Sequence, residues 1–112
     1  MNLVMPGLDG LKKMKQLMID LRANPLTEIA GIPVAARKDY SDGTHTDVAT
    51  GEVTEIELKG SNVLKYHLAD GTDLVIRPSG TEPKVKVYIL AAGEGAADKI
   101  PALAEWADTL KN

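Results

Sequence analysis

The sequence contains no cysteine, which excludes disulfide bonds and thiolate metal sites and is compatible with a reducing compartment. We therefore expect a cytoplasmic protein. No apolar run approaches the roughly 18 residues that a membrane span needs, and the N-terminus lacks the basic and then apolar pattern of a signal peptide. We expect no membrane partner. Aromatic residues are scarce, with one tryptophan, three tyrosines and no phenylalanine, so the core must consist of aliphatic and methionine side chains.

Length and charge narrow the possible functions further. At 112 residues the chain is large enough for one hydrophobic core but not for two, and we expect a single domain over residues 1–112. The net charge of −3 argues against nucleic acid as a partner, because such binding depends on many phosphate-neutralising lysines and arginines. A site for an anion must therefore be a local positive spot on an acidic surface.

Two segments place apolar residues at helical spacing. The first is LDGLKKMKQLMIDLRANP, residues 8–25, where Asp9 is the expected N-cap and Asn24-Pro25 the expected end. The second follows GEGAAD, residues 93–98, and has Trp106 near its edge. The apolar stripes consist of Leu11, Met14, Leu17, Met18 and Leu21 in the first helix, and of Ile100, Leu103, Ala107 and Leu110 in the second.

Other segments are expected to form strands, because they are short and apolar, contain β-branched residues or alternate apolar and polar residues. They are the short stretch 3–5, residues 28–40, and the runs 63–68, 74–77 and 84–89, with Asp70-Gly71 as a hairpin turn. Residues 41–61 are polar and glycine-rich, so we expect a long loop there, with at most a short strand at 53–58. Such a loop either runs over the surface or packs against something outside this chain. The order predicts an α+β domain in which two helices pack on a mostly antiparallel sheet.

The common catalytic and metal-binding motifs are absent from the sequence. His45 and His67 have no carboxylate or second histidine at ligand spacing, so we expect neither to bind a metal or to transfer protons. Residues 39–50 lack the glycine at position six and the glutamate at position twelve of a calcium loop. There is no P-loop and no dinucleotide fingerprint. We expect no catalytic residue, metal site or cofactor in this chain.

The segment VIRPSGTEPKVKVYIL, residues 75–90, is the most informative. Its loop RPSGTEP has the composition of a plain hairpin connection, because Pro, Ser and Gly favour turns for conformational reasons. However, Pro78 keeps Arg77 extended, and Gly80 lets the backbone amides approach a ligand. Ser79 and Thr81 add hydroxyl donors. The loop therefore also has the donors of an anion-binding cradle.

Cations flank this loop on both sides. Arg77 has a planar fork suited to bidentate phosphate contact. Lys84 and Lys86 share one face of the following strand, so one or both could reach the loop. Glu82 would repel a phosphate unless it points away or pairs with a lysine.

These residues resemble the last domain of the phosphoglucomutase/phosphomannomutase (α-D-phosphohexomutase) family. The similarity is carried by SNVLKYHLADGTDLVIRPSGTEPKVKVYI, residues 61–89, and supported by PGLDGLKKMKQLMIDLR and IPVAARKDYSDG. RPSGTEPK followed by an alternating strand is the specific part. The resemblance implies a TATA-box-binding-protein-like fold of order β-α-β4-α, with residues 2–5 as a truncated first strand.

The resemblance also implies a role. Members of the family have four domains and interconvert hexose 1-phosphate and hexose 6-phosphate, which makes them isomerases that act by intramolecular phosphotransfer. Their last domain binds the phosphate of the substrate. Carried over to this sequence, the site consists of Arg77, Ser79, Gly80, Thr81 and Lys86, with Lys84 as a weaker member.

The other motifs of the family are missing from this sequence. The resemblance places a phosphoserine loop in the first domain, a magnesium site in the second and a sugar loop in the third. The chain is therefore expected to be a C-terminal fragment that binds a hexose phosphate beside those three domains and is inactive alone. Two alternatives remain: a freestanding phosphate-binding module, and an interaction domain in which RPSGTEP is only a turn.

Overall fold

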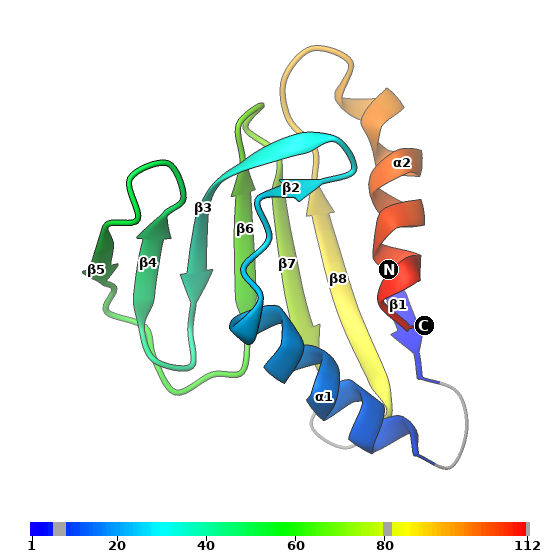
Figure 1. Ribbon diagram of the computed structural model, residues 1–112. Helices are drawn as coiled ribbons and strands as arrows, with labels where there is room; N and C mark the ends of the chain where they lie inside the picture. Colours follow the sequence, from blue (N-terminus) through cyan, green and yellow to red (C-terminus); the bar gives the residue numbers. More distant parts are fainter. Residues whose placement is uncertain (6–8, 80–81, 112) are drawn as a thin grey trace.

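The computed structural model describes residues 1–5, 9–79 and 82–111. These residues form two helices, a short 3-10 helix and eight strands (Figure 1). One helix follows the first strand, and the second helix and the 3-10 helix follow the last strand. The helices are α1 (Gly10–Ala23), α2 (Ala96–Asp108) and η1 (Thr109–Lys111). The strands are β1 (Asn2–Val4), β2 (Glu28–Ile29), β3 (Ile32–Asp39), β4 (Thr44–Asp47), β5 (Val53–Glu55), β6 (Leu64–Leu68), β7 (Asp73–Pro78) and β8 (Lys84–Leu90).

The strands form one antiparallel sheet in the order β1-β8-β7-β6-β3-β4-β5, and β2 pairs with β3. Figure 1 shows both helices on the same side of this sheet, and both contact β8. We call this side the covered face and the other the open face. The predicted α+β fold with two helices on an antiparallel sheet is confirmed. Neither helix in the described part of the chain is long and apolar enough to cross a membrane.

The expectation of a long loop over residues 41–61 is wrong, apart from the short strand expected within 53–58, which is β5. Thr44–Asp47 pairs with β3, and Val53–Glu55 pairs with β4, so this segment extends the sheet as a hairpin. The β4 sequence, THTD, is polar and half-buried throughout, and all of β5 is exposed. Apolar alternation is absent because neither strand buries a face in the core, and backbone pairing with β3 determines the structure instead.

The core forms on the covered face from alternate residues of the central strands. Leu64, Tyr66 and Leu68 of β6 are fully buried, as are Leu74 and Ile76 of β7. The helices cover these strands and contribute Met14, Met18 and Leu21 from α1 and Leu103 and Ala107 from α2 to the core. Each large apolar side chain buried in this way contributes about 1.5–3 kcal/mol.

The helix stripes are confirmed except at two positions, since Leu11 at the start of α1 is 47% exposed and Ile100 of α2 is also exposed. Asp9 precedes α1 but makes no side-chain cap hydrogen bond, and the helix ends before Asn24-Pro25 as expected. In α2 the side chain of Ile100 remains 44% exposed. Periodicity placed it on the apolar stripe, but α2 buries a narrower strip of its surface.

Two arginines on the covered side have protein partners. Arg22 Nε donates to Asp39 Oδ2 at 3.0 Å, and Arg37 Nη1 donates to the Leu21 carbonyl oxygen at 3.1 Å. Burial alone would raise the pKa of Asp39, but hydrogen bonds from Ser41 and Arg22 lower that pKa below its ordinary value. The pair therefore stabilises the fold above the unfolded-state pKa, and this contribution is lost as the pH falls through the folded-state value.

The predicted Asp70-Gly71 turn joins β6 to β7 and is linked to α2. Gly71 has a φ of +91°, a backbone conformation that glycine adopts without strain. Asp70 accepts hydrogen bonds from Lys99 Nζ at 2.8 Å and from the Thr72 amide at 2.9 Å. These bonds, the one from Lys99 first, lower the pKa of Asp70 from 3.8 to about 2.

Candidate functional site

Arg77 and Lys86 face one another across the hairpin of β7 and β8. The two residues are direct partners in the antiparallel register, and both are exposed. Each belongs to the set that alternates with the buried residues, so both project from the open face. Neither side chain makes a hydrogen bond or ion pair within the described part of the chain. Because like charges directly opposite one another destabilise a sheet, this arrangement favours an anionic partner.

Backbone and side-chain contacts close the stem of the loop between these strands. The Ser79 amide donates to the Lys84 carbonyl oxygen at 2.8 Å, which extends the hairpin pairing by one step. The Glu82 amide donates to Ser79 Oγ at 3.3 Å. Ser79 therefore lies at the start of the loop, two residues after Arg77. Gly80 and Thr81, which the sequence also predicts as site residues, lie outside the described residues.

The carboxylate of Glu82, which could repel an anion, is paired with a lysine. Its Oε2 lies 3.0 Å from Lys84 Nζ, so the negative charge is paired within the loop stem. The same contact occupies the lysine, whose part in the site stays a prediction. Lys84 and Lys86 do share the open face, as the alternation predicts.

A shallow groove of about 670 Å³ adjoins Arg77 on the open face. Its volume falls within the roughly 300–1,000 Å³ typical of small-molecule sites. Tyr88, 44% exposed, offers an aromatic surface, and Asn62 offers an amide. The complete lining consists of Ser61, Asn62, Val63, Val75, Arg77, Pro78 and Tyr88. A ligand whose anionic end contacts Arg77 has room here for its remaining atoms.

The far side of the loop stem is held by contacts that the sequence does not predict. The Met5 amide donates to the Pro83 carbonyl oxygen at 2.7 Å. A Cβ atom on Gly10, the first residue of α1, would lie 2.7 Å from Pro83 Cβ and 2.8 Å from the Met5 carbonyl oxygen. Glycine thus lets the start of α1 approach the loop stem closely. A glycine at the beginning of an otherwise regular helix is the one sequence signal that points to such an approach.

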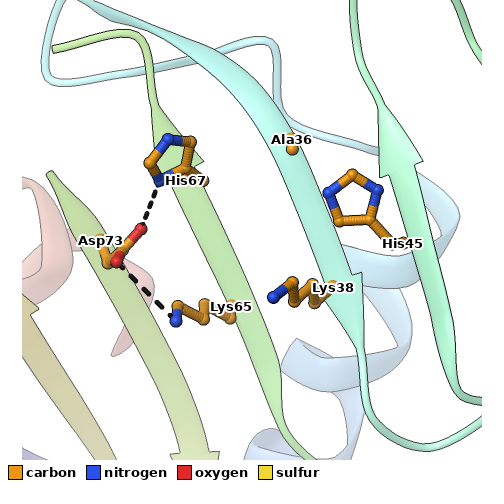
Figure 2. Close-up of a pocket in the computed structure, with 6 residues that line it drawn as sticks. All are labelled: Ala36, Lys38, His45, Lys65, His67 and Asp73. Atoms are coloured by element: carbon orange, nitrogen blue, oxygen red, sulfur yellow. Dashed lines mark hydrogen bonds and ion pairs between the residues drawn. The ribbon is translucent and has the colours of Figure 1, made fainter. Parts of the chain in front are cut away.

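His67 has a carboxylate partner, contrary to the sequence expectation. It stands opposite Asp73 in the β6–β7 register, and its Nδ1 donates to Asp73 Oδ1 at 2.7 Å (Figure 2). The two residues are six apart in sequence, so linear spacing did not reveal the pair. Within the described residues, no three His, Cys, Asp or Glu side chains are grouped as a metal site would require.

Comparison with known proteins adds independent information. Residues 9–104 match the family model for "Phosphoglucomutase/phosphomannomutase, C-terminal domain". A phosphoglucomutase of Staphylococcus epidermidis is 39% identical over 83 residues, which cover 74% of this chain and 15% of that protein. A phosphoglucomutase of Staphylococcus aureus is 41% identical over 85 residues, which also cover 74% of this chain and 15% of that protein. The match thus spans only 15% of the length of these curated relatives.

Proposed function

Because this chain belongs to the phosphoglucomutase/phosphomannomutase family and corresponds to its C-terminal domain, we propose that it binds the phosphate group of a hexose phosphate. The proposed site consists of Arg77, Ser79, Gly80, Thr81 and Lys86, with Lys84 as a weaker member. The single observation that carries this proposal is the opposed pair of exposed cations, Arg77 and Lys86, at the base of the loop. Neither has an anionic partner among the described residues.

Each residue has a distinct part in the proposed site. The guanidinium of Arg77 donates two parallel hydrogen bonds to phosphate oxygens, and Lys86 adds a compact positive charge. The Ser79 hydroxyl, at the loop entrance, donates a further bond. Gly80 and Thr81 supply backbone amides and a hydroxyl. Lys84, which pairs with Glu82, adds field strength more than direct contact.

In a full-length protein, this domain would work beside three others. We propose that such a protein interconverts hexose 1-phosphate and hexose 6-phosphate in the cytoplasm. The 112-residue domain would hold the phosphate that is not being transferred, and the phosphoserine and magnesium would belong to other domains. The domain alone would then bind substrate without converting it. Recognition by charge and backbone amides suits this task, since the same loop must accept a phosphate on either end of the sugar.

The proposal is tested by titrating the isotope-labelled chain with glucose 6-phosphate and following the backbone amides of residues 77–86 by NMR. We expect saturable shifts centred on this segment. Arg77→Ala should weaken binding about tenfold or more, because a hydrogen bond to a charged group contributes about 1.5–3 kcal/mol and about 1.4 kcal/mol corresponds to tenfold.

The matched control is Lys15→Ala, which removes the same charge from an exposed position on α1. It should leave the affinity within about twofold of the unmodified chain, while the dispersed spectrum verifies folding in both variants. Amides that do not move at millimolar ligand, or that respond equally in Arg77→Ala, would reduce RPSGTEP to a hairpin connection.

A further inference from the structure

A second group of basic side chains lies on the open face, further along the same sheet (Figure 2). It surrounds a hollow of about 230 Å³ lined by Ala36, Lys38, His45, Lys65, His67 and Asp73. We call this the basic hollow. Asp73 precedes Arg77 by four residues, which is about 13 Å along an extended strand. The basic hollow is therefore separate from the groove beside Arg77 and shares no lining residue with it.

Strand register concentrates positive charge at the basic hollow. Lys38 of β3 is the direct partner of His45 on β4 and of Lys65 on β6. Three basic side chains thus occupy adjacent positions on three strands, and in Figure 2 the Lys38 side chain extends toward Lys65. Like charges opposite one another disfavour strand pairing. A sheet position that keeps two lysines side by side is chemically suited to a shared anion.

The floor of the basic hollow comes from an irregularity in β3. The β3–β6 register shifts between Val34 and Ala36, which places Val34 opposite Leu68 and Ala36 opposite His67. A β-bulge of this kind redirects the side chains that follow it. Val34 is buried in the core, whereas Ala36 lines the basic hollow. Its single methyl group leaves space that a larger side chain would fill.

The single carboxylate among the lining residues is already engaged. Asp73 accepts from His67 Nδ1 at 2.7 Å, and its other oxygen lies 3.7 Å from Lys65 Nζ. The side chains of Lys38 and His45 make no hydrogen bond or ion pair with any residue that the structure describes. Lys38 is nevertheless half-buried. The lining therefore carries positive charge that its one carboxylate does not balance. The side chains of Lys38 and His45 also have hydrogen-bond donors without an acceptor among the described residues.

We propose that the basic hollow binds a small phosphate-bearing anion, with Lys38, Lys65 and His45 as its donors. Its volume is below the roughly 300–1,000 Å³ of drug-sized sites, so it suits a phosphate group better than a whole organic ligand. A tetrahedral phosphate offers oxygens to donors on three strands at once, and lysine binds phosphate well as a point charge. A metal ion would meet two ammonium groups here. This proposal does not depend on the phosphosugar site at Arg77.

The test follows the imidazole resonances of His45 and the thermal midpoint of the chain as sodium phosphate is added at pH 7.5. Sodium chloride at equal ionic strength and sodium acetate at equal concentration are parallel arms. We expect a saturable His45 shift and a rise in midpoint with phosphate alone, because a ligand that binds only the folded state stabilises it. Lys38→Gln, which keeps most of the side-chain length, should weaken this response at least fivefold.

Three further variants decide the interpretation. Lys15→Gln removes one charge from α1 and should leave the response unchanged. Arg77→Ala should leave the phosphate concentration at half-maximal His45 shift unchanged, which separates this site from the phosphosugar site, whatever it does to the thermal midpoint. Lys65→Gln is a second lining variant and should weaken the response as Lys38→Gln does. The proposal is overturned if chloride or acetate reproduces the His45 shift, if both lining variants respond like the unmodified chain, or if phosphate produces no saturable shift.

Discussion

The two faces of the sheet present alternate residues of the same strands, but their cationic side chains differ in whether they have a partner within the chain. On the covered face, Arg22 contacts Asp39 and Arg37 donates to a helix carbonyl oxygen. On the open face, Arg77, Lys86 and Lys38 have no partner among the described residues. On the covered face both arginines have partners within the chain. On the open face Lys84 and Lys65 lie near Glu82 and Asp73, but Arg77, Lys86 and Lys38 are left for another molecule to neutralise. The comparison predicts that stability and anion binding separate by face.

The largest expected effect comes from neighbouring residues of β7. Leu74 is fully buried on the covered face, and Val75 lines the groove on the open face. Leu74→Ala should cost about 2–5 kcal/mol of unfolding free energy, because it creates a cavity in the core. Val75→Ala should cost about 1 kcal/mol or less, since its side chain is only half-buried. Urea denaturation measures both, and equal costs would remove the distinction between the faces.

An intermediate effect is expected where the covered face supports the site. In Gly10→Ala the new Cβ would lie 2.7 Å from Pro83 Cβ and 2.8 Å from the Met5 carbonyl oxygen. Overpacking of this kind costs about 1–3 kcal/mol, and the shift of Pro83 should also weaken glucose 6-phosphate binding. Denaturation and NMR titration measure the two consequences.

The double variant Gly10→Ala with Pro83→Ala isolates this contact, because removing the proline ring should recover part of the lost stability. A Gly10→Ala variant that is more stable than the unmodified chain would be the opposite outcome. An ordinary helix position gains up to about 1 kcal/mol when glycine becomes alanine. A stabilised Gly10→Ala variant would therefore show that the close approach to the loop stem is unimportant.

A smaller effect is expected at the β6–β7 turn. The folded-state pKa of Asp70 lies near 2, below the ordinary 3.8, so its bond to Lys99 contributes stability above about pH 4 and loses it as the pH falls toward 2. Asp70→Asn should lower the thermal midpoint at pH 5 by the equivalent of about 1 kcal/mol or less. The difference between variant and unmodified chain should shrink by pH 2. A difference that is constant over this range would exclude the charge as its cause.

The elements with a regular apolar pattern could be predicted from the sequence, because the helical spacing or strand alternation of their apolar residues follows from burial of one face. This holds for α1, for β6 through β8 and for the Asp70-Gly71 turn. The hairpin of β4 and β5 could not, since THTD and VTE bury no face in the core. The exposure of Ile100 also depends on how α2 packs, which its own periodicity does not determine.

The residues of the candidate site could be proposed from the sequence, but their arrangement could not. The segment RPSGTEP indicated the position of the loop, and strand alternation indicated that cations lie on both sides of it. That Arg77 opposes Lys86, that His67 pairs with Asp73, and that Lys38 lies between two basic partners all depend on strand register. The contact of Gly10 with Pro83 joins residues far apart in the chain. Such relations appear only once the sheet is assembled.

The most direct measurement follows the Nε–Hε resonances of Arg77 and Arg22 in one NMR titration with glucose 6-phosphate. Arg22 Nε already donates to Asp39 on the covered face, so it serves as an internal reference. If the loop holds the sugar phosphate, the Arg77 resonance shifts saturably and in step with the amides of residues 79–86, while Arg22 stays in place. An Arg77 resonance that stays fixed, or that moves together with Arg22, would contradict the proposed phosphate contact.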